Sequence, residues 1–121
     1  MKTLNFKRIT LIVLLVGLIA VLASCSSTPK TVQFTLVAED IMWSTTTITA
    51  KVNQPVELTL RNDGALDHDF VVEELGIDVL LSPGDVEIVN FTVDHAANIK
   101  YICSIPGHEE AGMVGEIVIT E

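Results

Sequence analysis

Hydrophobic and polar positions alternate in short runs along the chain from residue 31 onward. In one run Val56, Leu58 and Leu60 are hydrophobic and the residues between them are polar. This period of two residues is typical of a β-strand with one buried face. Turn sequences separate similar runs at residues 31–37, 44–52, 68–72, 86–93, 99–103 and 115–120. Seven or eight short strands at this spacing predict an all-β protein, a Greek-key β-sandwich.

The run at residues 86–93 changes phase partway along. Val86 and Ile88 are hydrophobic at even positions, whereas Val89, Phe91 and Val93 are hydrophobic at odd positions. A β-bulge shifts the side-chain alternation by one residue, and a strand buried on both faces has no polar side. We therefore expect one of these two features in this strand.

The first residues have a different pattern. Lys2, Lys7 and Arg8 form a positive segment, and the next 16 residues, Ile9–Ser24, carry no charge. A membrane-spanning helix needs about 20 apolar residues, so this run is short for one, and its charged start is typical of a signal peptide. The predicted organisation is a signal peptide at 1–24, a polar tether at 25–30 and a single domain at 31–121.

The segment Leu22–Cys25 reads LASC and resembles a bacterial lipobox. The resemblance implies that Cys25 receives a diacylglyceryl group and becomes the new N-terminus after cleavage. Lipid chains would then hold an exported protein at the outer face of a bacterial membrane, in the periplasm or at the cell surface. The alternative is an uncleaved signal anchor in which the cysteine is incidental.

Removal of the signal peptide increases the negative charge of the chain. The whole sequence has 7 basic and 16 acidic residues, and cleavage removes three basic residues and no acidic ones. The mature chain therefore carries a net charge of −12. Such a chain is unsuited to nucleic acid, because binding to phosphates requires lysine and arginine. It favours a basic protein partner, and this attraction weakens as salt increases.

Lipid attachment at Cys25 would leave Cys103 as the sole thiol of the mature protein. An odd cysteine in an exported protein is intermolecular, reactive or a ligand. A disulfide between the two cysteines requires that Cys25 carry no lipid. Cys103 also begins a regular series, because His108 and Met113 follow it at equal intervals with four residues in each gap.

The strand period places three of the possible metal ligands on inward faces at one end of the sandwich. Cys103 shares a face with Tyr101, while His68 and Met113 share faces with hydrophobic residues of their own strands, and His108 lies in the loop. Two imidazoles, a thiolate and a weak axial thioether are the ligands of a blue-copper site. The alternative is a buried structural thiol close to core histidines.

Residues 31–121 resemble the cupredoxins, the family of blue copper proteins. The Cys-x4-His-x4-Met series, with Pro-Gly before the histidine and Gly before the methionine, is similar to the rusticyanin-type loop. The upstream segment NDGALDHDF is similar to the turn that carries the first histidine of the family. The resemblance implies one mononuclear copper ion, bound by His68, Cys103, His108 and Met113.

The residue after the first histidine is often Asn or Ser in this family, and here it is Asp69. Groups around a metal orient its ligands, so we expect the Asp69 carboxylate to hold Ser104 or its backbone. The alternative is that Asp67 and Asp69 both point into solvent. We expect His95 at the surface, and Trp43 and Met42 either in the core or covering a loop.

The resemblance implies a one-electron carrier in which His108 serves as the electron port. A small apolar patch around it is expected from Gly64, Ala65, Pro106, Ala111 and Gly112. Glu109 and Glu110 would give this patch an acidic rim, suited to a basic redox partner such as a c-type cytochrome or an oxidase. We expect the protein to be a monomer.

Two other classes use similar atoms. A copper-delivery or copper-storage protein is the alternative function, but such proteins usually have labile or methionine-rich sites, and only Met42 and Met113 remain after cleavage. A multicopper oxidase needs more histidines than the three present, so we expect no enzyme. The binuclear copper centre of oxidases needs a second cysteine in the loop, where Gly107 stands.

Overall fold

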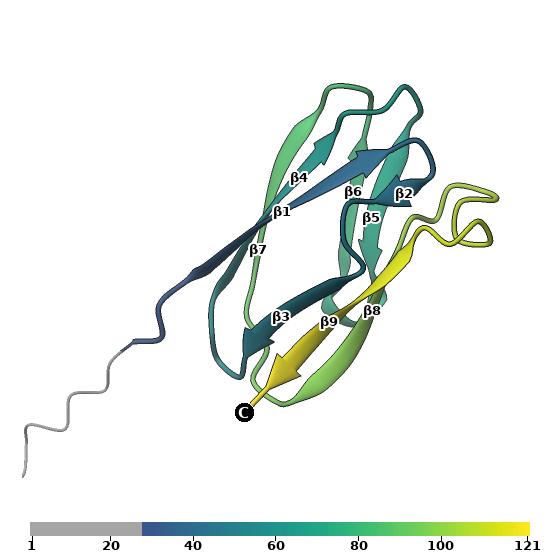
Figure 1. Ribbon diagram of the computed structural model, residues 1–121. Helices are drawn as coiled ribbons and strands as arrows, with labels where there is room; N and C mark the ends of the chain where they lie inside the picture. Colours follow the sequence, from purple (N-terminus) through teal and green to yellow (C-terminus); the bar gives the residue numbers. More distant parts are fainter. Residues whose placement is uncertain (1–27) are drawn as a thin grey trace, which may run out of the picture.

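The computed structural model describes residues 28–121, which fold into two β-sheets packed face to face (Figure 1). The predicted signal peptide and Cys25 lie outside the described residues. One sheet has the order β2-β1-β4-β7 and contains β1 (Val32–Glu39), β2 (Met42–Trp43), β4 (Val56–Asn62) and β7 (Val86–Phe91). The other has the order β3-β9-β8-β5-β6 and contains β3 (Thr47–Lys51), β5 (His68–Val72), β6 (Ile77–Leu81), β8 (Ala97–Ile102) and β9 (Val114–Thr120).

The predicted all-β sandwich is confirmed, with nine strands in the described part of the chain. The sequence pattern did not separate β6 from β5. The two strands are joined by a short 3-10 turn, η1 (Glu73–Leu75), and by Gly76. Gly76 has a φ angle of 63°, in the left-handed region that glycine adopts readily. No helix within residues 28–121 is long and apolar enough to cross a membrane.

Strand β4 shows how the alternating pattern builds the core. Val56, Leu58 and Leu60 are buried, and the residues between them are partly exposed. The strand pairs in parallel with β1 and antiparallel with β7, so its inner side chains lie in the middle of their sheet. Fully burying such an aliphatic side chain contributes about 1.5–3 kcal/mol.

The expectation for the phase change in β7 is wrong. The register of β7 against β4 runs without interruption from Val86 to Phe91, so this strand has no bulge. Val86 and Ile88 are 58% and 59% exposed, so neither is it buried on both faces. Val89 and Phe91 turn toward the core, while Val86 and Ile88 lie on the opposite face of the strand, which is open to solvent.

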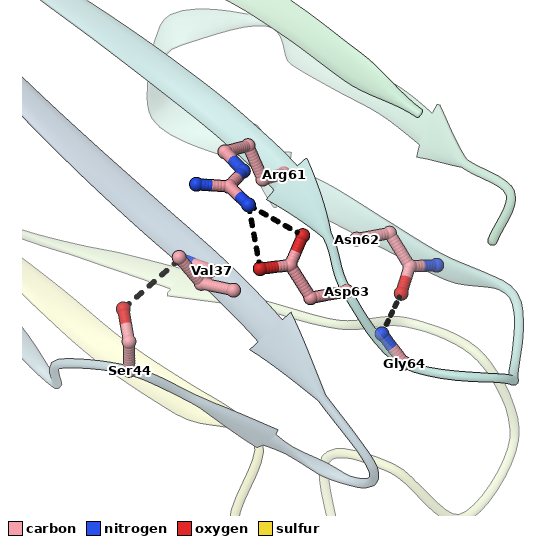
Figure 2. Close-up of polar contacts among 6 residues, drawn as sticks. All are labelled: Val37, Ser44, Arg61, Asn62, Asp63 and Gly64. Atoms are coloured by element: carbon pink, nitrogen blue, oxygen red, sulfur yellow. Dashed lines mark hydrogen bonds and ion pairs between the residues drawn. The ribbon is translucent and has the colours of Figure 1, made fainter. Parts of the chain in front are cut away.

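The loops at one end of the sandwich come together. The loop that connects β4 to β5 and the loop that connects β8 to β9 lie at the same end of the molecule (Figure 1). The β1–β2 hairpin closes beside them through two hydrogen bonds. The Val37 N–H donates to the Ser44 hydroxyl at 2.9 Å (Figure 2), and the Ser44 N–H donates to the Val37 carbonyl at 2.8 Å.

Candidate metal centre

Three buried side chains meet at this loop end: His68, Cys103 and His108. One ligand atom from each lies within 4.8 Å of the other two. The Cys103 Sγ is 3.3 Å from the Nδ1 of His108 and 3.9 Å from the Nδ1 of His68. Both imidazoles therefore turn the same type of nitrogen toward the sulfur.

The sheet positions His68 as the first residue of β5, where it pairs with Leu81 of β6. Cys103 directly follows β8 and continues its inward face, which is why its side chain is fully buried with Tyr101. Strands β5 and β8 are neighbours through the pair Val71 and Ile102. Two ligands thus come from adjacent strands of one sheet.

The loop after Cys103 is held by its own backbone. The His108 N–H donates to the Ile105 carbonyl at 3.0 Å, and later turns close at Ala111 and Gly112. Gly107 and Gly112 have φ angles of 89° and 100°, which side chains with a Cβ rarely adopt. The loop is therefore a series of tight turns that return the chain to His108 and onward to β9.

Met113 is fully buried and is tied to both loop ligands through its backbone. Its N–H donates to the His108 carbonyl at 3.0 Å, and its carbonyl accepts the Cys103 N–H at 3.0 Å. These two bonds join the first and last residues of the Cys-x4-His-x4-Met series. The structure thus brings the backbones of all three together, and the role of Met113 as a ligand stays a prediction.

Asp69 and Asp67 flank His68 and differ in their surroundings. Asp69 is only 8% exposed, and its carboxylate accepts hydrogen bonds from the Ser104 N–H and the Ser104 hydroxyl, each at 2.5 Å. Asp67 is exposed. The contact expected between Asp69 and Ser104 is therefore present, and the alternative in which both aspartates point into solvent is not observed.

Burial controls the protonation of the ligands. Desolvation raises the pKa of the Cys103 thiol above its ordinary value. Desolvation, followed by the nearby His108, lowers the pKa of His68. In the metal-free protein at neutral pH, Cys103 is therefore a thiol and His68 is a neutral imidazole, whose ring nitrogen is free to bind a metal.

An aromatic cluster packs beneath the site. The Trp43 ring centroid lies 6.5 Å from that of His68 and 6.1 Å from that of Tyr101. The Tyr101 hydroxyl donates to the Thr45 carbonyl at 2.7 Å. The structure thus places Trp43 in the core and His95 on the surface, 72% exposed, as expected, whereas Met42 is exposed and not part of the core.

The surface around His108 only partly matches the predicted patch. His108 itself is 8% exposed. The exposed members of the predicted set are Ala65, Pro106, Ala111 and Gly112, while Gly64 is partly buried. Two exposed hydrophobic residues, Ile41 and Leu66, come from the neighbouring loops and were not part of the prediction.

The predicted acidic rim is divided between two environments. Glu109 pairs with Lys100, with the Nζ and Oε1 atoms 2.5 Å apart, while Glu110 is exposed. A cavity of about 300 Å³ lies beside this pair, on the outer face of β5 and β8. It is lined by Val71, Glu73, Glu74, Lys100, Ile102 and Glu109.

Asn62, a fully buried polar residue at the end of β4, was not predicted from the sequence to have a role. Its side-chain amide donates to the carbonyls of Leu66 and Leu81, and its Oδ1 accepts the Gly64 N–H. A signal for this role was present in the pattern. Asn62 continues the buried alternation that runs through Leu60, and a polar residue at a core position must be hydrogen-bonded.

The donor atoms fit one copper ion. Imidazole nitrogen and thiolate sulfur lie about 2.0–2.3 Å from a bound metal, so the corners of a trigonal plane are about 3.7 Å apart. The observed separations of 3.3 and 3.9 Å bracket this value. A His₂Cys set with a methionine nearby is the combination that blue-copper sites use.

Comparison with known protein sequences gives a consistent picture. A family model described as a cupredoxin-like domain matches residues 11–119. The chain is 29% identical over 90 residues to the copper-resistant cuproprotein CopI of Vibrio cholerae, covering 58% of this chain and 53% of that protein. It is 26% identical over 107 residues to the CopI protein of Rubrivivax gelatinosus, covering 69% and 63%. The chain thus spans less than two thirds of these relatives' own length.

Solved structures share the fold. Reduced auracyanin from Roseiflexus castenholzii has a TM-score of 0.64 at 19% identity, with 79% of this chain and 99% of that chain covered. The metal-binding domain of the Cu(I)-exporting ATPase CopA from Streptococcus pneumoniae, solved with Cu(I), has a TM-score of 0.65 at 17% identity, covering 82% and 93%. Since the family model matches most of the sequence, this chain belongs to the cupredoxin-like family, and its loop end forms a single copper site.

Proposed function

We propose that this protein is a one-electron carrier that uses a mononuclear copper ion held by His68, Cys103, His108 and Met113. The observation that carries the proposal is the convergence of two imidazoles and a thiol within 4.8 Å in a buried site. Thiolate and thioether favour the cuprous state and imidazole suits both states, so bound copper would supply a reversible one-electron couple.

The protein's part is to keep these ligands in place. Backbone hydrogen bonds tie Met113 to Cys103 and His108, and Asp69 fastens Ser104 to β5. The ligand side chains are buried, which excludes water. A site fixed in this way changes little between oxidation states, so little reorganisation would accompany the transfer of an electron.

The surface supports a basic partner. Lys100 neutralises Glu109, but Glu73, Glu74 and Glu110 take part in no ion pair within residues 28–121. The mature chain carries a net charge of −12, which would steer a positively charged protein such as a c-type cytochrome or an oxidase domain toward it. We propose that this contact is transient and that the protein acts as a monomer, not as an enzyme.

Copper delivery or storage is the second candidate function. The names of the CopI relatives favour it, because they describe copper-resistant cuproproteins. The buried ligands favour electron transfer instead, since a delivery site must expose its metal to an acceptor. Full burial of Cys103 and Met113 leaves little room for such an exchange.

Optical and paramagnetic-resonance spectra of the copper-loaded protein test the copper site. We expect an intense visible band from thiolate-to-copper charge transfer, and its loss in Cys103→Ser, because the transition starts on sulfur. A Cys103→Ser protein that stayed blue would eliminate the ligand assignment.

The two functions are then separated by rates. For an electron carrier, reduced cytochrome c should reduce the cupric protein quickly. A cuprous chelator should remove copper from the reduced protein much more slowly. The reverse order would support delivery.

We propose that lipid on Cys25 anchors the protein to the outer face of a bacterial membrane. The basis is the LASC segment and the charged, apolar stretch before it. Mass spectrometry of membrane-extracted protein should show cleavage before Cys25 and an added diacylglyceryl group. The control is Cys25→Ser, which should remain unprocessed; an intact segment 1–24 in the wild-type protein would overturn the proposal.

A further inference from the structure

We propose that Asn62 is a positioning residue that sets the location of His68 in the copper site; this rests on the copper site proposed above. Within residues 28–121 the side-chain hydrogen bonds of Asn62 go to Leu66, Leu81 and Gly64 and to none of the proposed ligands, and Asn62 lies six residues before His68. Its position at the end of β4 places it where the loop carrying His68 leaves the sheet.

The side chain of Asn62 makes three hydrogen bonds, all of them to backbone groups. Its Nδ2 donates to the Leu66 carbonyl and to the Leu81 carbonyl, both at 2.8 Å. Its Oδ1 accepts the Gly64 N–H at 3.0 Å (Figure 2). Because the residue is fully buried, no solvent replaces these bonds if they are lost.

The two carbonyl groups that Asn62 holds belong to two segments next to His68, one along the chain and one across the sheet. Leu66 is two residues before His68 in the chain, and Leu81 is paired with His68 across the β5–β6 ladder. A single amide group therefore fixes the distance between the loop that enters β5 and the strand that faces it. The location of the His68 imidazole depends on both.

The backbone of Asn62 extends this connection to the β6–β7 turn. Its N–H donates to the Asp85 carbonyl at 3.0 Å, and its carbonyl accepts the Gly84 N–H at 2.9 Å. Leu81 ends the strand just before that turn. The side chain of Asn62 thus binds the last residue of β6, and its backbone binds the turn that follows.

The bond to Gly64 fixes the loop against the β1–β2 turn. A Cβ atom placed on Gly64 would lie 3.1 Å from the backbone nitrogen of Asp40 and 3.4 Å from the Asn62 Oδ1. The loop is therefore packed tightly between Asn62 and Asp40. A methyl group at position 64 would be close to both atoms, so the loop would have to shift by a few tenths of an ångström, while the donors of Asn62 are retained.

The test compares Asn62→Asp with Asn98→Asp. Both changes replace a side-chain amide with a carboxyl group, but Asn98 is an exposed residue of β8, whereas Asn62 is fully buried. The aspartate at position 62 keeps an acceptor for Gly64 and loses the donor to Leu66 and Leu81. In the copper-loaded full-length protein in detergent, Asn62→Asp should change the ratio of the visible bands and the copper hyperfine splitting. It should also lower copper affinity about tenfold, the lower end of the loss seen when groups around metal ligands are removed.

Hydrogen exchange of the metal-free protein gives a readout independent of copper. Amides of residues 64–68 should exchange faster in Asn62→Asp than in the wild type or Asn98→Asp. If the wild-type protein bound no copper, the proposed function would fail while this measurement still reported on the loop. If Asn62→Asp were merely less stable, with unchanged spectra, affinity and local exchange, the positioning role would be refuted.

Gly64→Ala serves as the second variant if Asn62→Asp does not fold. It alters the same loop from the opposite side and retains every Asn62 donor. We expect the spectral shift to recur in a stably folded protein. Spectra and exchange identical to the wild type in Gly64→Ala would mean that the location of this loop does not control His68, and this would overturn the proposal.

Discussion

The carboxylate of Asp69 binds Ser104 twice, through its backbone N–H and its hydroxyl, each at 2.5 Å. Asp69 directly follows His68 and Ser104 directly follows Cys103. This one contact therefore joins the two segments that carry the first histidine and the thiol. It also places a buried carboxylate next to the site.

Replacing Asp69 with Asn should raise the reduction potential and leave the ligands in place. Negative charge close to copper stabilises the cupric state, and the 8% exposure of Asp69 limits screening by solvent and salt. Asn retains an oxygen that accepts one bond from Ser104. Spectroelectrochemical titration measures the potential. The matched control is Asp67→Asn, an exposed position on the other side of His68, which should shift the potential much less. Equal shifts in both variants would show that Asp69 acts only through net charge.

Replacing Met113 with Leu should retain bound copper and raise the potential. In blue-copper sites the methionine sulfur is a weak, long axial ligand, and it tunes the potential more than it holds the metal. Met113 is fully buried and leucine has a similar volume, so the core should tolerate the change at a cost below about 1.5 kcal/mol. Visible spectra and redox titration check both statements. A variant that lost copper would show that Met113 has a larger share in metal binding.

The alternation of side chains was sufficient to predict the sandwich and the inward position of His68 and Cys103. Val56, Leu58 and Leu60 are buried as their period requires. The same parity rule placed Cys103 and His68 on inner faces, and both are fully buried. Since a strand has only two faces, the period of two residues determines inside and outside once the hydrophobic set is known.

The features that escaped prediction depend on contacts between distant segments. Val86 and Ile88 look like core residues, yet they are exposed because they lie on the outer face of their sheet, which is open to solvent at these positions. The alternation through Leu60 indicates that Asn62 is buried, but one of its partners, the Leu81 carbonyl nineteen residues away, is identified only by the fold. Local pattern carries no information about which strand becomes an edge or which loops meet.

Replacing Gly115 with Ala should destabilise the fold near the site. A Cβ at this position would lie 2.2 Å from the Tyr101 Cζ and 2.7 Å from the Thr46 carbonyl oxygen, so the tyrosine ring must move. That movement also breaks the bond from the Tyr101 hydroxyl to Thr45. Overpacking and the lost hydrogen bond together should lower the free energy of unfolding by about 2–4 kcal/mol.

Urea unfolding of the metal-free protein measures this loss. Tyr101→Phe is the comparison, because it removes only the hydroxyl group. Burial raises the pKa of Tyr101 to about 12, so this hydroxyl remains a donor across the usual pH range. We expect Tyr101→Phe to cost about 1 kcal/mol. If Gly115→Ala cost no more than Tyr101→Phe, the close approach of Gly115 to the ring would not matter for stability.

Copper binding should release a proton from Cys103 at neutral pH. Burial raises the pKa of this thiol above its ordinary value, so the metal-free protein carries the proton at pH 7, and the thiolate forms only when metal binds. Apparent affinity should therefore rise as pH rises, by about tenfold per unit, and level off above the thiol pKa. The lowered pKa of His68 means that its imidazole is already neutral at pH 7. His68 therefore releases no proton when metal binds at this pH, and protons compete with the metal for it only in acid.

Anaerobic addition of cuprous ion to weakly buffered protein measures the released proton directly. We expect about one proton per copper from Cys103 at pH 7 in the wild type, and about one fewer in Cys103→Ser, whose hydroxyl does not ionise in this range. The paired measurement isolates the thiol, since both proteins keep His68 and His108. Identical proton release from the two proteins would mean either that Cys103 is not a ligand or that its thiol is already ionised before the metal arrives.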